Sequence, residues 1–491
     1  GLGDVYKRQP SNRWGYFPAA ALGWRMSEEA FLNDVDWLDN LKLRVSYGEV
    51  GNDGINSSLW SQNWEATSDK RYQGAVNGAF LPSYSLGADM ANKDLKWETT
   101  ITRNIGVDFG FFNSRLTGTI DAYWNTTKDL LMKTAIPGIT GFTSTYANVG
   151  QTSNKGIEFA LQGVLVKTRD WNVTAGFNIN FNRGKVDKLA DNVTGLYGTE
   201  WATSSTFPKS DYVLKEGRPV GLVRGLTADG FYTTDDFTYE NGVYTLKEGV
   251  ADVSSAVFPN YHLHNGMNER PAGQLAYPGM AKFKDLNDDG IINDDDVDVI
   301  GDMTPVHTGG FNINATYKNF DLGLYFNWSY GNEIYNVNKL AALYGYKEGA
   351  VYENKLSIVK DCYKIYDVVN GELVALTTPE QLNAANANAK LPLAYSENGY
   401  VSTLGIEDGS YLRLNTLTLG YTLPKSMLQK AGISNLRVYG SIYNVFTITG
   451  YSGIDAEVST STSTKTYPQL GMDWGTYPRA RSFVLGVNLS F

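Results

Sequence analysis

The sequence predicts an all-β protein, a transmembrane antiparallel β-barrel, and three observations support that fold class. Apolar and polar residues alternate in runs about ten residues long, the length that a tilted strand needs to cross a bilayer. The composition is rich in glycine and aromatic residues, with 51 Gly, 32 Tyr, 21 Phe and 11 Trp, but has only 15 Pro. Short and long connections alternate between the runs, as they do in outer-membrane barrels.

Two runs show the alternation most clearly. In WNVTAGFNINFN, residues 171–182, the odd positions are apolar and the even positions are Asn, Thr or Gly. FDLGLYFNWSY, residues 320–330, has its apolar residues at the even positions. Because successive side chains of a strand point to opposite faces, each of these strands has one apolar and one polar face. The polar face, with Asn178, Asn180 and Asp321, is expected to hydrate an inner wall.

About eleven strands of this kind are expected along the chain. They span residues 14–24, 41–50, 103–112, 116–124, 157–166, 171–182, 310–317, 320–330, 411–421, 436–446 and 481–491.

The connections between these strands fall into two classes. Short connections are expected as tight turns at residues 113–114, 167–170 and 318–319 and as modest turns at 27–40 and 422–435. Long external loops are expected at about 51–96, 126–154, 183–306, 331–410 and 447–480. Structureless loops of that length would argue against a compact soluble domain, whereas barrels carry long loops on the outer side and short turns on the periplasmic side.

The last strand, RSFVLGVNLSF, alternates up to the final residue. An amphipathic strand at a sheet edge exposes unpaired backbone groups, so we expect this strand to be the seam that closes a barrel. Its apolar residues are also expected to be the insertion signal that the barrel assembly machinery recognises in outer-membrane proteins. These residues are Phe483, Leu485, Val487, Leu489 and Phe491.

The strand count predicts that the chain is part of a longer protein. Bacterial single-chain barrels have an even number of strands and both ends in the periplasm, whereas about eleven strands place the first strand's start outside. Further strands are therefore expected upstream. Residues 1–9, GLGDVYKRQ, lack the apolar region of a signal peptide and are expected to be non-native or a truncation scar, with the barrel portion at 10–491.

Several function classes are disfavoured by composition and motifs. The chain has 42 basic and 52 acidic residues without a basic stripe, which argues against a nucleic-acid partner. It contains no phosphate-binding loop, nucleophile elbow or dinucleotide fingerprint, and its three histidines form no metalloprotease motif. The lone Cys362 is expected to be an isolated thiol. We therefore expect no enzymatic activity.

One motif carries recognisable metal chemistry. DLNDDGIINDDD, residues 285–296, fits the spacing of a twelve-residue calcium loop with a glycine at position 6. The expected ligands are Asp285, Asn287, Asp289, the carbonyl of Ile291, Asn293 and Asp296. Position 12 is Asp instead of Glu and the flanks are not helical, so an unmetallated acidic turn is the alternative. If Ca²⁺ binds, we expect it to stabilise a long external loop.

Aromatic residues of the expected external loops are candidates for substrate contact. They are Trp60, Trp64, Tyr72, Tyr84, Trp201, Tyr232 and Tyr244. Their flat faces could stack on sugar rings or contact a lid protein, and the alternative is that they pack the loops together. At strand ends, Trp328, Tyr330 and Tyr421 are expected to belong to an interfacial girdle.

Several blocks of the sequence resemble the SusC/RagA family of TonB-linked outer-membrane transporters. They include WLDNLKLRVSYGEVGN, GRPVGLVRGLTADGFYTTDDF, AKFKDLNDDGIINDDDVDVIGD and YLRLNTLTLGYTLPKSMLQKAGISNLRVYGSIYNVFTITGYSGIDAEV, in the order of the family, and the match runs from Asn12 to Phe491. The resemblance implies a 22-stranded barrel with a plugged lumen. It also implies a SusD-like surface lipoprotein as partner and TonB-driven import of oligosaccharides or peptides. The plug and the TonB-contacting segment would precede Gly1.

Two alternatives share parts of this pattern. An outer-membrane adhesion or binding barrel without transport would need neither plug nor TonB contact. A secreted β-rich enzyme acting on glycans would be soluble without detergent and would not need a terminal aromatic residue.

Overall fold

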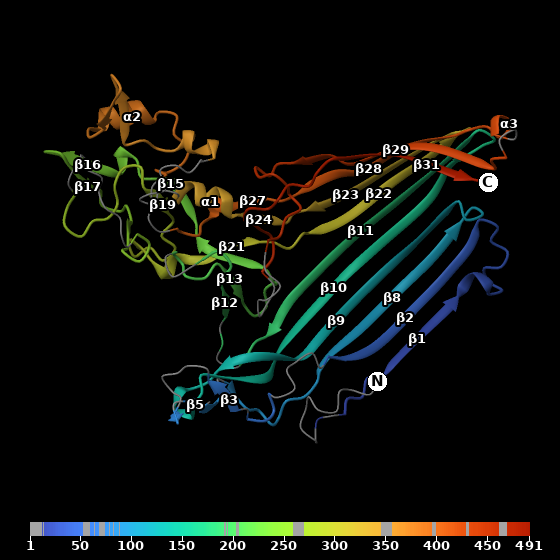
Figure 1. The fold of residues 1–491 in the computed structure, drawn as a ribbon, viewed down its shortest axis with the longest axis horizontal. Helices are drawn as coiled ribbons and strands as arrows, with labels where there is room; N and C mark the ends of the chain where they lie inside the picture. Colours follow the sequence, from blue (N-terminus) through green and yellow to red (C-terminus); the bar gives the residue numbers. More distant parts are fainter. Residues whose placement is uncertain are drawn as a thin grey trace.

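The computed structural model describes residues 12, 14–52, 59–62, 64–67, 74–77, 79–81, 83–87, 89–190, 193, 195–202, 206–258, 270–344, 356–394, 399–428, 432–460 and 469–491. The first nine residues therefore lie outside the described part. One large antiparallel sheet dominates the chain, and its strands follow each other in sequence order (Figure 1). This confirms the predicted all-β, antiparallel fold class.

The large sheet consists of eleven long strands in a single path. In order they are β1 (Ala19–Arg25), β2 (Leu38–Asn52), β8 (Glu98–Phe111), β9 (Leu116–Ala135), β10 (Ser144–Lys167), β11 (Trp171–Lys188), β22 (His307–Tyr317), β23 (Phe320–Tyr330), β28 (Tyr411–Thr422), β29 (Asn435–Thr449) and β31 (Ser482–Ser490).

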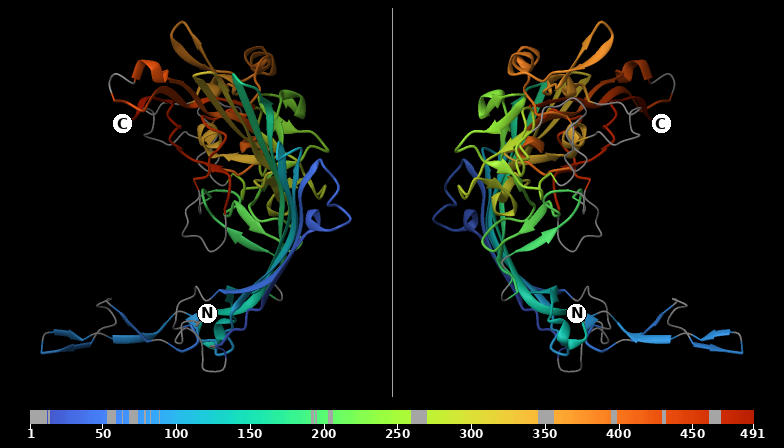
Figure 2. Two further views of the ribbon diagram at one scale, coloured as in Figure 1. Left: turned by 90° about the vertical axis from the view of Figure 1, so that its right-hand side faces the viewer. Right: turned by 90° about the vertical axis from the view of Figure 1, so that its left-hand side faces the viewer.

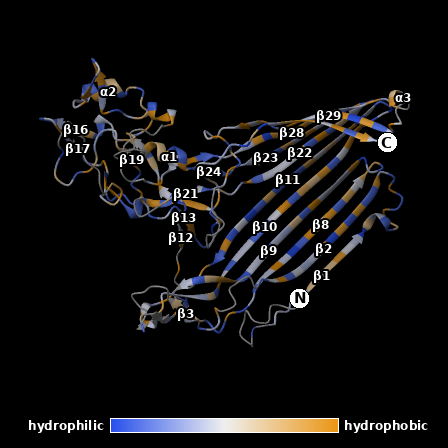
Figure 3. Ribbon diagram, in the orientation of Figure 1, coloured by the Kyte–Doolittle hydropathy of each residue, from blue (hydrophilic) through white to orange (hydrophobic). Residues whose placement is uncertain are grey.

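The register places residues of the same sheet face opposite each other. Asn178 lies opposite Ala160 on one side and Gly310 on the other, whereas Phe177 lies opposite Leu161 and Phe311. Figure 3 shows the resulting alternation of hydrophobic and hydrophilic residues along the strands. The apolar face is widely exposed, as expected of a surface that lipid covers.

The sheet curves into an open trough (Figure 2). Its two edges are β1 and β31. The last strand pairs with β29 from Asn435↔Ser490 to Tyr443↔Ser482, and among the described residues it pairs with no other strand. The closing contact that the sequence predicts for this strand is therefore not made within the described part of the chain.

The predicted loop at 126–154 is wrong. β9 continues to Ala135 and β10 begins at Ser144, so only residues 136–143 connect the two strands. The ladder passes through register shifts between Asn148 and Gly150 and again between Gly150 and Thr152, and Asp129 has a positive φ of 58°. These bulges break the period of two, so the alternation could not be followed through them.

Long and short connections lie at opposite ends of the trough (Figure 1). Residues 53–97, 189–306, 331–410 and 450–481 separate strands at the long-loop end. The other end carries the connections 26–37, 112–115, 168–170, 318–319 and 423–434, the last with helix α3 (Lys425–Leu428). Among the described residues no helix is long and apolar enough to span a membrane.

The second and third long connections pack into a separate body, called the external unit below (Figure 1). Its strands are β12 (Leu196–Gly198), β13 (Tyr212–Leu214), β14 (Leu222–Leu226), β15 (Ala228–Phe231), β16 (Phe237–Glu240), β17 (Val243–Leu246), β18 (Asp252–Val253), β19 (Ala281–Phe283), β20 (Ile291–Ile292), β21 (Val297–Asp302), β24 (Glu333–Asn336), β25 (Tyr366–Val369), β26 (Glu372–Ala375) and β27 (Ile406–Asp408), with β30 (Met472–Asp473) from the last connection. Its helices are α1 (Val337–Tyr344) and α2 (Pro379–Asn386).

The first long connection forms small hairpins that project from the trough (Figure 2). β3 (Trp64–Thr67) pairs with β6 (Ser83–Leu86), and β4 (Gly74–Val76) pairs with β5 (Ala79–Leu81). The short strand β7 (Asp89–Met90) pairs with the start of β10.

Candidate functional site

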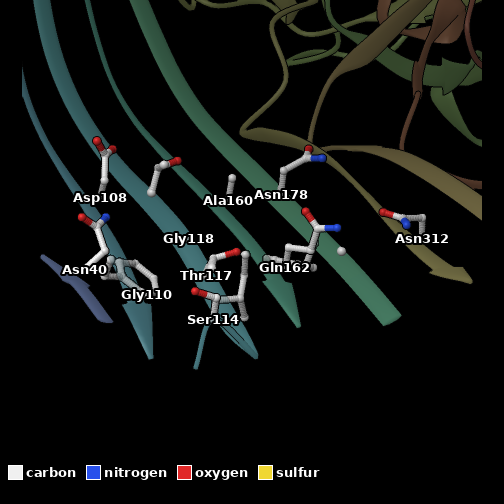
Figure 4. A pocket seen from close by; sticks show the side chains of 15 residues that line it. Asn40, Asp108, Gly110, Ser114, Thr117, Gly118, Ala160, Gln162, Asn178 and Asn312 are labelled. Carbon is white, nitrogen blue, oxygen red and sulfur yellow. The ribbon is translucent and has the colours of Figure 1, made fainter. Parts of the chain in front are cut away.

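The concave face of the trough carries a polar pocket of about 630 Å³ (Figure 4). Residues of six neighbouring strands line it, and four amides and three hydroxyls are among them. They include Asn40, Asp108, Thr117, Gln162, Asn178 and Asn312. The register brings them together, because Gln162 lies opposite Thr117 on one side and Gly176 on the other. Small residues between the amides leave the space that forms the pocket.

Amides and hydroxyls both donate and accept hydrogen bonds, so this wall can hold water, a polar solute or a polypeptide. The pocket has no histidine, cysteine or lysine, and its single carboxylate, Asp108, is engaged by Arg44. Such a set recognises polar groups but offers no nucleophile with an adjacent base. The inner wall is therefore suited to binding and passage.

An ion cluster lies beside the polar pocket and crosses three strands. The Nη2 of Arg44 on β2 lies 2.8 Å from Asp108 on β8 and 2.9 Å from Asp121 on β9. The guanidinium passes over Gly106, where a Cβ would lie 2.6 Å from Nη2. A glycine on the middle strand thus lets one side chain join strands that are not adjacent.

The same arrangement recurs near the other edge of the sheet. Arg437 on β29 donates from Nε to Asp321 on β23 at 2.8 Å, passing over Gly420 of the intervening β28. Asp321, which the sequence places on the polar face, is thus part of an ion pair. Asn178 lines the polar pocket, and Asn180 follows it on the same face of β11.

A buried arginine joins the wall to the last long connection. Arg413 on β28 is 2% exposed and donates from Nε to the Thr447 hydroxyl at 3.0 Å. Its other nitrogens bind Asp455, and Glu457 at 3.1 Å. Arg479 also contacts Glu457, at 2.9 Å. Sequence reasoning missed this network, although an arginine at an alternating position of a predicted strand was an available signal.

The predicted substrate aromatics separate into two groups. Trp64 and Tyr84 are 66% and 62% exposed on the β3–β6 hairpin, and Trp60 is half-buried. Tyr72 lies outside the described residues. Substrate contact by these aromatic residues therefore stays a prediction.

For Tyr232 and Tyr244 the structure favours the packing alternative. Both are fully buried in the core of the external unit, where Tyr232 donates to the Ala251 carbonyl at 2.6 Å and Tyr244 to the Thr377 carbonyl at 3.0 Å. Burial raises the pKa of both phenols. Trp201 packs against the same core, with its ring nearly perpendicular to that of Tyr335. Neither tyrosine has a free face for a sugar ring, so the packing alternative holds for them.

The acidic loop folds around its own backbone. Asp285 accepts from the Gly290 N–H at 2.7 Å, and the fully buried Asp296 accepts from Leu286 and Asn293 at 2.7 and 2.8 Å. Gly290 has a positive φ of 86°, as the sharp turn requires. In the described part of the chain, no three His, Cys, Asp or Glu side chains come together as a metal site. Calcium binding through Asp285, Asn287, Asp289, Ile291, Asn293 and Asp296 stays a prediction.

Two further sequence-predicted features are placed by the structure. Phe483, Leu485, Val487 and Leu489 share one face of β31, and with Phe491 they are between 45% and 89% exposed. An insertion signal would be accessible there, and its role stays a prediction. Cys362 is buried, and burial raises the pKa of its thiol to about 11, so the reactive thiolate is scarce at neutral pH.

The chain matches the family model described as TonB dependent receptor-like, beta-barrel, over residues 2–445. It is 30% identical to TonB-dependent receptor P3 of Formosa agariphila, covering 98% of this chain and 42% of that protein. It is also 30% identical to TonB-dependent receptor SusC of Bacteroides thetaiotaomicron, over 98% of this chain and 40% of the relative. The chain thus spans less than half the length of these relatives.

Solved structures share the fold. The RagAB peptide transporter superposes with a TM-score of 0.70 at 24% identity, covering 99% of this chain and 44% of the other. This likeness agrees with the antiparallel wall and with the external unit at one end. The resemblance, the fold class, the outer-membrane location and the absence of enzymatic activity that the sequence predicts all agree with these relatives. The chain therefore belongs to the TonB-dependent receptor β-barrel family of the outer membrane.

Proposed function

We propose that the protein to which this chain belongs imports oligosaccharides or oligopeptides across the outer membrane, in a process that TonB drives. The observation that carries the proposal is the concave wall, which is polar, glycine-rich and pocketed over strands whose opposite face is apolar. A solute that passes through a barrel needs such a wall, because amides can replace the hydrogen bonds that the solute makes with water.

The relatives support the choice of cargo classes. One structure with the same fold is described as a peptide transporter, which supports peptides, and the family resemblance of the sequence blocks keeps oligosaccharides as the other candidate. Because this chain spans less than half of those proteins, the activity is assigned to the whole parent protein. The plug and the segment that contacts TonB would lie in the rest of that protein.

We also propose a SusD-like lipoprotein as the partner on the cell surface. Exposed apolar side chains gather on hairpins at the long-loop end, and large exposed apolar patches often mark protein interfaces. On the β3–β6 hairpin, Trp64, Tyr84 and Leu86 are exposed and share one face. On the β25–β26 hairpin, Val368 and Leu373 are paired and exposed.

A growth experiment tests the import proposal. The parent gene is deleted in its own bacterium, and growth is measured on a defined peptide mixture and on a defined oligosaccharide as sole source of the nutrient. We expect growth to be lost on one of them and to be lost equally when TonB is removed. Normal growth on both, combined with reduced attachment to surfaces, would support the adhesion alternative instead.

A further inference from the structure

A second pocket lies where the trough meets the external unit. It has a volume of about 460 Å³ and is called the mouth pocket below. Its lining comes from the long-loop ends of β8, β9, β10 and β11 and from the chain around β13. The apolar members are Leu130, Leu131, Met132, Val186, Leu189, Leu214 and Val220. The polar members are Glu98, Thr152, Ser153, Asn154, Lys185 and Lys188, with Gly184 between them.

Bulges create the mouth pocket. The β10 ladder shifts register beside Gly150 and again between Gln151 and Thr152, so the wall turns out of its regular path there. A Cβ on Gly150 would lie 2.7 Å from the Met132 sulfur and 3.1 Å from the Leu130 Cβ. Glycine therefore lets these two apolar side chains cover β10 on the pocket side.

The external unit closes the other side of the mouth pocket. The Val186 N–H donates to the Arg218 carbonyl at 2.9 Å, and the Gly217 N–H donates to the Val186 carbonyl at 2.7 Å. Val186, Leu189 and Leu214 form a small buried core of their own. These contacts hold the chain around β13 against the end of β11, so the pocket is preformed.

The chemistry of the lining restricts the ligand. All the apolar members are aliphatic or carry a thioether, and no aromatic ring lines the pocket. The hydroxyls of a sugar would lose hydrogen bonds against the aliphatic part of this lining, and none of its described residues offers a ring on which a sugar could stack. An aliphatic side chain would gain from burial there.

One polar group of the lining suits a peptide backbone. The Oδ1 of Asn154 is buried and has no hydrogen-bond partner among the described residues. It is an unsatisfied acceptor among the residues that line the pocket. The Glu98 carboxylate also lines the pocket, where it accepts from the Leu131 N–H at 2.8 Å and from the Asn52 amide at 2.5 Å. A pocket with aliphatic walls and a few convergent polar groups is typical of a ligand site.

We propose that the mouth pocket binds an aliphatic side chain of an oligopeptide, with Asn154 accepting a hydrogen bond from the peptide backbone. The proposal rests on the import function and narrows its cargo to peptides that contain leucine-like residues. It assigns a first binding position at the long-loop end of the inner wall, before the polar pocket farther along the trough.

Binding is tested on the full-length receptor purified from outer membranes in detergent. The probes are a leucine-rich oligopeptide, its serine-substituted counterpart and a linear malto-oligosaccharide, each titrated by calorimetry. The variants are Leu131→Asn, which makes the lining polar, and Val220→Trp, which fills the pocket. Ile139→Asn is the matched control, because Ile139 is 96% exposed in the connection between β9 and β10.

We expect the leucine-rich peptide to bind more tightly than the serine peptide. Leu131→Asn and Val220→Trp should each weaken its binding about tenfold or more, which corresponds to about 1.4 kcal/mol. Ile139→Asn should bind as the unaltered receptor does. Asn154→Leu, which keeps the volume, should weaken binding while leaving the preference for leucine over serine.

Three results would overturn the inference and leave the import function standing. They are equal binding of the two peptides, unchanged peptide binding by both pocket variants, and binding of the oligosaccharide alone. A lower thermal midpoint without a change in peptide affinity would also overturn it, because the pocket would then be a packing site for the receptor itself. If no probe binds and deletion leaves growth on both nutrients intact, the proposed function itself fails.

Discussion

At the residue scale, the most deeply buried charge of the inner wall is met by partners. Arg413 is almost completely buried, yet Asp455, Glu457 and Thr447 satisfy its guanidinium. A buried ion pair contributes little net stability, but removing one partner leaves the other charge buried and uncompensated. Truncating different members of this network should therefore lower the free energy of unfolding by different amounts.

We predict that Asp455→Ala lowers the free energy of unfolding of the full-length receptor by about 3 kcal/mol or more, because Arg413 loses its buried partner. Glu457→Ala should cost less, since the Glu457 side chain is 37% exposed. Urea unfolding in detergent, followed by limited proteolysis of residues 450–460, measures both effects. Equal losses from the two variants would contradict this account.

The glycine beneath the Arg44 cluster gives a second prediction. Gly106→Ala places a methyl group where Arg44 and Asp121 lie, so the ion cluster must shift and the free energy of unfolding should fall by about 1–3 kcal/mol. Gly163→Ala is the control, because a Cβ there meets no atom nearer than 3.7 Å. The same unfolding assay compares them. A similar loss in the control would mean that strand propensity, and not the ion cluster, is responsible.

At the element scale, the external unit is a small folded body with its own ion pairs. Asp236 accepts from Lys282 at 2.8 Å and from the Thr233 N–H at 2.7 Å. Burial by itself would raise the pKa of Asp236, but Lys282 and Thr233 outweigh burial and hold that pKa below its usual value. Because the pKa of Asp236 is lower in the folded protein than in the unfolded chain, the stability of the external unit depends on pH.

We predict that the unit loses stability in acid through Asp236. A carboxyl whose pKa is lower in the folded state contributes stability above its ordinary pKa and loses that contribution as pH falls through the folded value. Asp236→Asn should therefore reduce the acid dependence of thermal unfolding between about pH 5 and pH 3. Asp235→Asn is the adjacent control. An unchanged acid dependence in Asp236→Asn would refute the assignment.

The acidic loop gives an element-scale test of the calcium prediction. If Ca²⁺ binds between residues 285 and 296, adding it to chelator-treated full-length receptor should raise the thermal midpoint, because a ligand that binds only the folded state stabilises it. Asp285→Asn should remove the gain. A thermal midpoint that calcium does not change, in the unaltered receptor or in Asp285→Asn, would favour the unmetallated turn. The hydrogen bonds of Asp285 and Asp296 already stabilise that turn.

At the scale of the whole molecule, β1 and β31 are the two edges of the sheet, and neither has an outer partner strand among the described residues. In lipid, an unpaired strand edge leaves backbone groups without hydrogen bonds, which costs several kcal/mol for each group. We predict that residues 10–491 expressed alone will not refold into a heat-modifiable barrel in detergent micelles, whereas the full-length receptor will. Band shifts on unheated gels measure this, and a shift by the short chain would disprove the prediction.

The strands could be read from the sequence because one face of each is apolar and the other polar. That constraint repeats every two residues, so the alternation in 171–182 and 320–330 predicted β11 and β23 directly. The predicted loop at 126–154 was wrong because the two-residue alternation is interrupted there. Beyond Asp129, bulges shift the register of β9 and β10, and no local pattern records which residues then pair.

The sequence by itself determined the fold class, the order of the wall strands and the family, because period-two alternation and motif order are local properties of the chain. Only the tertiary structure decided that Tyr232 and Tyr244 are core residues while Trp64 and Tyr84 are exposed. It alone brought Leu131 and Val220 to one pocket. Long loops fold by contacts between distant segments, and those contacts leave no periodic pattern in the sequence.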